Sequence, residues 1–378
     1  MKNKKLLLII WILFSAVSLP AQEKERELPK FKLGGALRFN YNFCDWKAGH
    51  RDRGGDFGFD VLYLKLTGSY RDIILSADYR FYSKDFGGPM LKYGWIGYRF
   101  NANNQIQVGL TGVPFGIQPV ASHNFFLQIA YYVGLEDDSD MGIKYLHTSE
   151  RWDLAFAFFK NADELLFGSD NETSDDRYGY DVAGRNKEIN QFNGQAFYKF
   201  GKNSRQRLGA SAEFGQLYNL DRRKNGTHYA LALHYELLWQ QVSLKAQVTT
   251  YAMHPKNAAD DDDEVISMTA YGAPYLVAAK ANIYMLSAGY TFPINRKFLK
   301  KIQVYNDFGC LQKQNNDFKD SFQNVTGGML DCNPVIIYVD YAMGKNHGWL
   351  GPDWDGFSAG DASNSWHARF NVNVGYYF

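Results

Sequence analysis

The chain has 378 residues, with 41 Lys and Arg against 40 Asp and Glu and a formal net charge of +1. This balance excludes a protein whose basic surface binds nucleic acid. The mean hydropathy is −0.38, and beyond the N-terminus no run approaches the roughly 18 apolar residues of a transmembrane helix, so helical membrane proteins are excluded too.

Aromatic residues are nevertheless abundant, with 26 Tyr and 28 Phe and an aromatic fraction of 16%. A transmembrane β-barrel accounts for both the low hydropathy and the high aromatic content. In such a barrel aromatic girdles face lipid while the alternate side chains face water.

The N-terminus has the pattern of a secretory signal peptide. Lysines open the chain, an apolar run follows from Leu6 to Leu19, and small residues lead to Ala21. The run is shorter than the roughly 20 residues of a membrane span. We therefore predict a cleaved signal peptide over residues 1–21, rather than a retained anchor, and one mature barrel domain over residues 22–378.

Segments of about ten residues with alternating apolar and polar side chains recur along the mature chain, which is typical of tilted membrane strands. In one such segment Leu75, Tyr79 and Phe81 lie on one face, and Asp78 and Arg80 lie on the other. Similar alternation covers residues 62–69, 95–100, 105–111, 152–158, 228–236 and 241–248. The fold class is all-β.

The connections favour a membrane barrel over a soluble sandwich. Short and long connections alternate along the chain. The short ones lie around Arg71, Asn103, Ser149, Gly201, Trp239 and Cys332, and the long ones include 113–140, 160–189 and 252–276. Outer-membrane barrels have short periplasmic turns and long external loops. We predict a closed antiparallel barrel of about sixteen strands, with fourteen or eighteen as alternatives because residues 309–344 are difficult to divide. An active transporter, with roughly 22 strands and a plug domain, does not fit this length.

The last segment alternates without interruption. Its apolar face runs from Trp366 to Phe378, and its polar face contains His367, Arg369 and Asn371. A soluble edge strand with such a stripe would invite aggregation. A terminal aromatic strand resembles the signal read by the outer-membrane insertion machinery, so we predict that machinery as a partner through Phe378.

Alternation also assigns ionisable residues to the lumen. We predict that the pore is lined by wall residues Lys65, Asp78, Arg80, Arg99, Lys245 and Arg369. Further lumen positions by the same reasoning are Asp153, Lys199, Glu213, Glu236 and Asp307. About sixteen strands enclose a lumen too wide for side chains alone to fill, which favours a water channel over a salt-bridged interior.

The connection from Val113 to Asp140 contains Phe125, Phe126, Tyr131 and Tyr132. In an exposed loop these large aromatic side chains would face water, which is unfavourable. We predict that it folds into the lumen and places Gln118, His123 and Asn124 near the constriction. The alternative is an outward loop or a latch between protomers.

The sequence predicts no catalytic residue, cofactor or metal. His234 and Glu236 share a face but lack a serine signature, and a serine on a neighbouring strand would be needed for an enzyme. The acids of Glu136 to Asp140 and of Asp260 to Glu264 suit Ca²⁺ but lack the spacing of a calcium loop, so we interpret them as solvated loop charges. The cysteines, Cys44, Cys310 and Cys332, lack metal-site spacing.

The octapeptide Gly109 to Gly116, with Ser122 after it and the strand pair 59–81 before it, resembles the phosphate-selective porin O and P family. The ending Asn371 to Phe378 resembles porin-like proteins of Bacteroidetes. The resemblance implies a sixteen-stranded, trimeric porin with an inward third loop. Residues 113–140 contain no Lys or Arg, and an anion pore needs rings of positive charge. Lys65, Arg80 and Arg99 could supply part of such a ring from the wall, but acids lie among them, so we predict weak or no phosphate preference.

The sequence thus predicts a porin in the outer membrane of a Gram-negative bacterium, embedded in lipid and lipopolysaccharide, that lets small hydrophilic solutes or ions diffuse passively with at most weak anion selectivity. The alternative is a non-transporting barrel whose loops act as a surface receptor or adhesin.

Overall fold

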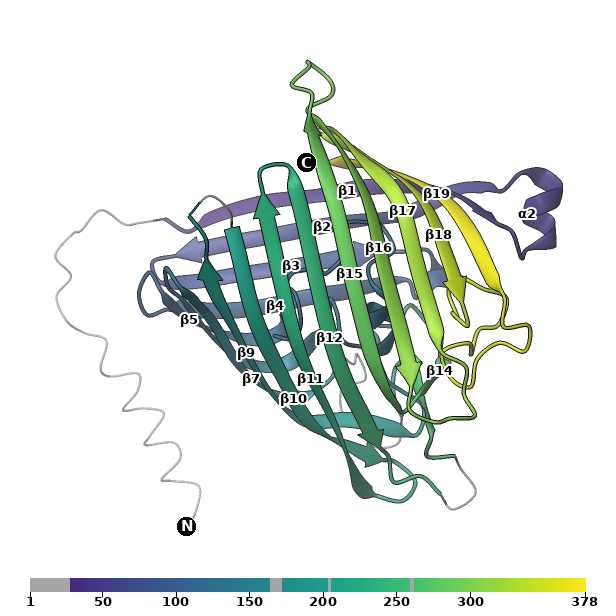
Figure 1. Cartoon of the computed structure of the whole chain (residues 1–378). Helices are drawn as coiled ribbons and strands as arrows, with labels where there is room; N and C mark the ends of the chain where they lie inside the picture. Colours follow the sequence, from purple (N-terminus) through teal and green to yellow (C-terminus); the bar gives the residue numbers. More distant parts are fainter. Residues whose placement is uncertain (1–27, 164–171, 203–204, 259–261) are drawn as a thin grey trace, which may run out of the picture.

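The computed structural model of the chain describes residues 28–163, 172–202, 205–258 and 262–378. The predicted signal peptide lies outside the described residues. Sixteen antiparallel strands of the described chain close into a barrel, which confirms the predicted fold class and strand count (Figure 1). Among the described residues, no helix is both long and apolar enough to cross a membrane.

The barrel strands follow one another in chain order. They are β1 (Lys30–Cys44), β2 (Asp56–Tyr70), β3 (Ile73–Phe81), β4 (Pro89–Arg99), β5 (Asn104–Gly112), β6 (Ser139–Thr148), β7 (Trp152–Asn161), β9 (Asn186–Phe200), β10 (Arg205–Asn219), β11 (Lys224–Trp239), β12 (Val242–His254), β15 (Lys280–Pro293), β16 (Lys301–Lys313), β17 (Ser321–Cys332), β18 (Val335–Lys345) and β19 (Trp366–Tyr377). Residues 309–344, which are difficult to divide from the sequence, contain the end of β16, the whole of β17 and all but the last residue of β18.

The first and last strands pair with each other and close the ring. Phe39 lies opposite Val374 in this register, and the backbone of Phe378 exchanges two 3.0 Å hydrogen bonds with Gly35. Closure leaves no strand edge unpaired in lipid, as a membrane barrel requires.

The two faces of each strand have the chemistry that alternation predicted. On β3, Tyr79 and Phe81 are exposed on the outer surface, whereas Asp78 and Arg80 are buried on the inner face. The same division holds on β19, where Phe370 and Tyr376 are exposed and Asn371 is buried. The outer surface is therefore an apolar band suited to lipid.

Short turns join the strands at one end of the barrel, and longer loops join them at the other. The loops used below are L3 (113–138), L4 (162–185), L6 (255–279) and L8 (346–365). L4 and L6 contribute β8 (Asp181–Val182), β13 (Val265–Thr269) and β14 (Tyr275–Ala278) to a separate three-stranded sheet. The other elements are helix α2 (Ala48–Arg53) and the 3-10 helices η1 (Lys84–Phe86) and η2 (Ile129–Val133).

The loops pack on one another in a buried aromatic cluster, which we call the loop core. Tyr131 of L3 contacts Tyr180 of L4 with ring centroids 4.8 Å apart, and its hydroxyl lies 2.6 Å from that of Tyr271 in L6. Tyr132 stacks on Phe357 of L8 at 5.8 Å. Aromatic pairs at these separations stabilise a packed interior, so the loops form one body.

Candidate pore and its lining

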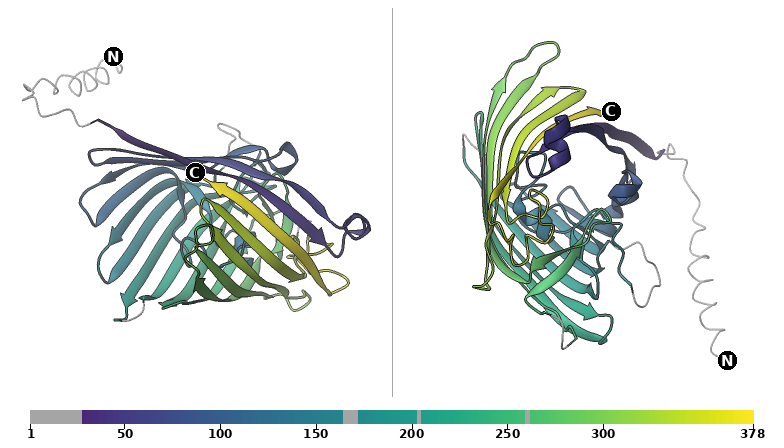
Figure 2. Two further views of the ribbon diagram at one scale, coloured as in Figure 1. Left: turned by 90° about the horizontal axis from the view of Figure 1, so that it is seen from above. Right: turned by 90° about the vertical axis from the view of Figure 1, so that its right-hand side faces the viewer.

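Loop L3 crosses the interior of the barrel. Although L3 joins the neighbours β5 and β6, the Ile117 amide donates to Gln247 on β12 at 2.9 Å. Gln323 on β17 donates to the Leu127 carbonyl at 2.8 Å. Strands β16 and β17 are opposite β5 and β6 in the ring, and Figure 2 (right) shows loop segments inside the ring of strands. L3 therefore divides the lumen.

Asp307 on β16 is the densest point of attachment. Its buried carboxylate accepts hydrogen bonds from the His123 amide at 2.7 Å, from the Asn124 amide at 3.0 Å and from the Asn124 side chain at 2.7 Å. It also lies 2.9 Å from His123 Nδ1. Lys245 holds the preceding residues by donating to the carbonyls of Val120 and Ser122 at 2.8 and 2.9 Å.

Near its other end L3 contains the buried side chain of Glu136. One of its oxygens accepts a hydrogen bond of 2.8 Å from the Ala121 amide. Burial raises the pKa of Glu136 to about 8, the Ala121 bond opposing this shift only in part. The carboxyl is consequently protonated below that pH, when it can cross-link the two ends of L3 without a buried charge.

Two histidine contacts bear on the enzyme alternative. Ser211 on β10 lies 2.9 Å from His234, so the neighbouring serine exists, but Glu236 pairs with Arg207 instead. His123 Nε2 lies 2.9 Å from Ser243 Oγ, and Asp307 lies on its other side. Serine, histidine and aspartate are connected in this order in a serine triad. All four contacts of Asp307 are made with L3, however, so the arrangement is accounted for by the attachment of L3 to the barrel wall.

A cavity of about 340 Å³ lies between L3, L4 and the wall formed by strands β19 and β1 to β4. Cations reach it from four strands of this wall: Arg38, Arg80, Lys92 and Arg369. Two carboxylates, Asp60 and Asp137, and a set of aromatic side chains that includes Phe125, Tyr178 and Trp349 complete its lining.

The cations are held in fixed positions by distinct partners. Arg38 pairs with Asp60 at 2.8 Å, and Lys92 pairs with Asp137 at 2.6 Å. Arg80 donates to Asp78 at 3.1 Å and lies 4.5 Å from the centre of the Tyr178 ring.

Arg369 differs from the other cations because it donates to a neutral acceptor, the side-chain oxygen of Asn42, at 2.8 Å. Its guanidinium lies 5.0 Å from the centre of the Phe126 ring. It therefore contributes positive charge that no hydrogen-bonded carboxylate offsets.

A second cavity, of about 470 Å³, adjoins the first on the loop side and shares Phe86, Trp349 and Arg369 with it. Its lining includes Lys47 and His50 at helix α2, and Trp354 of L8. These two adjoining cavities lie along β1 and β19 beside the loop core, and we refer to them together as the passage.

The structure brings only two of the predicted pore-lining residues, Arg80 and Arg369, into this passage. His123, Asn124 and Lys245 attach L3 to the wall. Gln118 turns back to its own loop and donates to the Phe115 carbonyl at 2.8 Å.

The remaining predicted residues lie elsewhere. Asp78 pairs with Arg80, and Lys65 is exposed with its ammonium 5.9 Å from the Tyr93 ring. Arg99 is exposed at the short-turn end, in a separate cavity with Gln105 and Asp153.

Sequence reasoning missed Arg38, Asp60 and Lys92. The sequence does contain a signal for Arg38, because it lies between outward Leu37 and Phe39 and ordinary alternation therefore places it on the inner face. Asp60 and Lys92 lie beside register shifts in the β1–β2 and β3–β4 pairs, where alternation loses its phase.

The interpretation of the acids in residues 136–140 as solvated is wrong. Glu136 and Asp140 are only 6% and 2% exposed, because L3 is folded inside the barrel and not outside it. Asp140 is also part of β6. The cysteines Cys44, Cys310 and Cys332 are free thiols.

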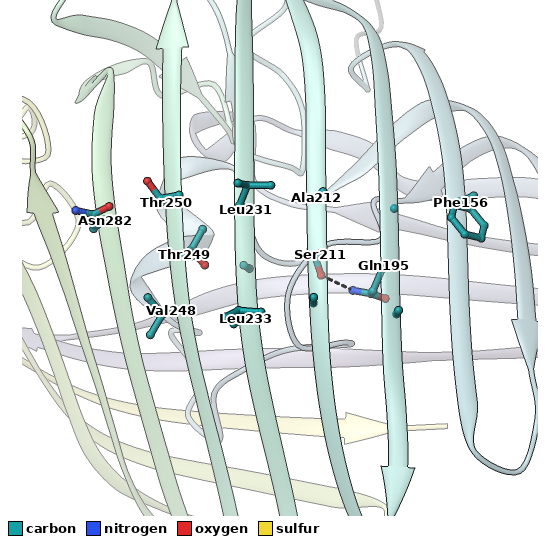
Figure 3. Close-up of a pocket in the computed structure, with 14 residues that line it drawn as sticks. Phe156, Gln195, Ser211, Ala212, Leu231, Leu233, Val248, Thr249, Thr250 and Asn282 are labelled. Atoms are coloured by element: carbon teal, nitrogen blue, oxygen red, sulfur yellow. Dashed lines mark hydrogen bonds between the residues drawn. The ribbon is translucent and has the colours of Figure 1, made fainter.

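Figure 3 shows a pocket of a different kind, on the outer surface across strands β7 to β15. Its volume is about 610 Å³, and small side chains such as Ala212 form its floor. The neighbouring Phe156, Leu231 and Leu233 are more than half exposed. Because these residues lie on the lipid-facing side, this groove is not part of the passage.

A sixteen-stranded barrel with an inward third loop is the architecture of outer-membrane porins. Solved structures that share it include OmpF of Salmonella typhi in a complex with daunomycin, with a TM-score of 0.63 and 12% identity over 94% of this chain and 100% of that one. An anion-selective porin from Comamonas acidovorans has a TM-score of 0.61 and 14% identity over 93% and 100% of the two chains. The outer membrane channel DcaP of Acinetobacter baumannii has a TM-score of 0.57 and 12% identity over 95% and 100%.

No protein-family model and no curated protein matches the chain. At these identities the structural likeness establishes the porin fold. The outer-membrane location predicted from the sequence agrees with that of these neighbours.

Proposed function

We propose that the chain is an outer-membrane porin through which small hydrophilic solutes and ions diffuse passively, with a weak preference for anions. The observation that carries this proposal is the passage between L3 and the β19–β4 wall, with its four cations. Rigid side chains at a constriction set which solutes pass, because solutes lose part of their hydration shell there.

The sign of the preference follows from the lining. Four cations against two carboxylates leave the first cavity, between L3 and the wall, positive, and Arg369 is the cation bonded to a neutral group. L3 itself supplies no Lys or Arg to the passage. The lining therefore supports a weak anion preference and argues against the strong phosphate selectivity of the family that the sequence resembles.

Planar-bilayer recording of the refolded protein tests the proposal. We expect stepwise conductance, and a reversal potential in asymmetric KCl whose sign shows that Cl⁻ is more permeant than K⁺. Arg369→Gln reduces the permeability ratio toward one, whereas Arg223→Gln, an exposed position between β10 and β11, leaves it unchanged. A lipid-embedded, folded protein without conductance steps would favour the receptor or adhesin alternative instead.

We also propose a homotrimer, as the resemblance implies, and contact with the insertion machinery through the strand that ends at Phe378. Light scattering of the detergent-solubilised protein, corrected for bound detergent, measures the protomer number directly.

A further inference from the structure

A cluster of acidic side chains lies where the end of L3, the start of β6 and L4 meet. Asp138, Asp140 and Asp181 each place one carboxylate oxygen within 4.8 Å of those of the other two. Asp163 belongs to the same region, since the Arg177 guanidinium approaches Asp163 at 3.7 Å and Asp181 at 3.4 Å. Residues from three separate segments thus converge on one point.

The positive charge near the cluster is smaller than the negative charge. Arg177 is one cation among four carboxylates. Two lysines of the adjoining strands have other partners: Lys92 binds Asp137 at 2.6 Å, and Lys144 donates to the Gly112 carbonyl at 2.6 Å. Asp140, Asp163 and Asp181 are each 2% exposed. Removing several like charges from water without compensation is strongly unfavourable.

Asp140 supplies an observation independent of the charge count. One of its oxygens accepts a hydrogen bond of 3.2 Å from Gln191. Its other oxygen, Oδ1, is fully buried and has no hydrogen-bond donor in the described part of the chain. A bound cation would satisfy this oxygen.

We propose that Asp138, Asp140 and Asp181 bind one divalent cation, and that Ca²⁺ is the ion that fits best. Oxygens bound to one Ca²⁺ lie at about 2.3–2.6 Å from it and so at most about 5 Å from one another. The observed separations satisfy that limit. Carboxylates are the ligands that this ion prefers, and its coordination tolerates irregular geometry, whereas Mg²⁺ demands a near-octahedral shell.

The site would join three parts of the barrel, next to the 2.8 Å hydrogen bond that the Tyr178 hydroxyl of L4 donates to Asp137 of L3. Asp138 ends L3, and its carbonyl accepts a 2.9 Å hydrogen bond from Val113 at the other end of that loop. Asp140 lies on the wall, and Asp181 starts the small sheet of L4 and L6. One ion fixes the base of L3 to L4, so the site acts on the position of the loop that divides the lumen.

Terbium luminescence tests the site on the full folded protein, because Tb³⁺ replaces Ca²⁺ and tyrosines excite it at short range. Tyr178 and Tyr180 shortly precede Asp181 in the sequence and are both buried. We expect one saturable Tb³⁺ site per chain, displaced by Ca²⁺ and less effectively by Mg²⁺. Asp140→Asn weakens binding at least tenfold, and Asp262→Asn, an exposed acid in L6, leaves it unchanged.

Asp181→Asn is the second variant if Asp140→Asn fails to fold, as judged by heat-modifiable migration in gels. Wild-type protein without a saturable site at pH 7.5 would overturn the proposal. So would equal affinity in the wild type and in a folded Asp140→Asn or Asp181→Asn variant. Because binding is measured without any transport assay, the result is independent of whether the barrel conducts.

Discussion

Replacing Asp307 by Ala is expected to release the middle of L3 from the barrel wall. The carboxylate accepts hydrogen bonds from both backbone amides and both side chains of His123 and Asn124. No other wall residue makes as many described contacts with L3. The substitution removes the acceptor and leaves four donors facing a small methyl group.

The expected cost follows from the burial of the carboxylate. Asp307 is 1% exposed, and removing a buried carboxylate that accepts several hydrogen bonds costs about 3–5 kcal/mol. That free energy corresponds to an increase of roughly 100-fold to 4,000-fold in the local opening equilibrium. Lys245 and Gln247 still hold the start of L3, so the loop loosens around residues 122–125 and does not leave the lumen.

Hydrogen exchange followed by mass spectrometry measures this opening in peptides that cover residues 120–127. We expect much faster exchange in Asp307→Ala, a partial return in Asp307→Asn, and no change in Asp317→Ala, an exposed position between β16 and β17. Single-channel recordings of the Ala variant should show larger current noise. Unchanged exchange in a folded Asp307→Ala protein would refute the assignment of Asp307 as the main attachment of L3.

Two further predictions concern pH and assembly. Because burial raises the pKa of Glu136 from its ordinary value to about 8, its stabilising contribution of about 5 kcal/mol is present in acid and is lost as the pH rises to 8. Current noise should therefore increase in the wild type as the pH rises from about 4.5 to about 8 and level off above that. It should stay constant in Glu136→Gln, and equal pH profiles would contradict this. Deleting Phe378 removes two backbone hydrogen bonds to Gly35 at the closing seam, so the yield of protein folded into vesicles should fall several-fold, whereas a yield equal to that of the wild type would argue against a role in insertion.

The strand count was predictable because apolar side chains that face lipid alternate with polar side chains that face the lumen along each strand. Tyr79 and Asp78 have opposite environments, although they are adjacent in the chain. Alternation also placed Arg80 and Arg369 on the inner face, where the structure has them, and the aromatic content of residues 125–132 correctly indicated an inward L3.

The rest of the site depends on contacts that alternation does not encode. A register shift brings Asp60 to the same side as the neighbouring Val61, and whether a shift occurs depends on the partner strand. Likewise, Asp138 and Asp181 meet only because L4 folds back over the end of L3. These two residues are far apart in the sequence, so the sequence does not predict that contact. The acids of residues 136–140 were therefore interpreted as solvated loop charges.

The shared loop core has a practical consequence for engineering this barrel as a carrier of foreign epitopes. A peptide inserted beside the core residues of L3, L4, L6 or L8 displaces aromatic rings that several loops use jointly, and the disturbance would spread to all of them. The tip of the connection between β10 and β11 is exposed at residues 221–223 and contributes nothing to that core. It is the place where added sequence can be displayed to the outside while the passage keeps its shape.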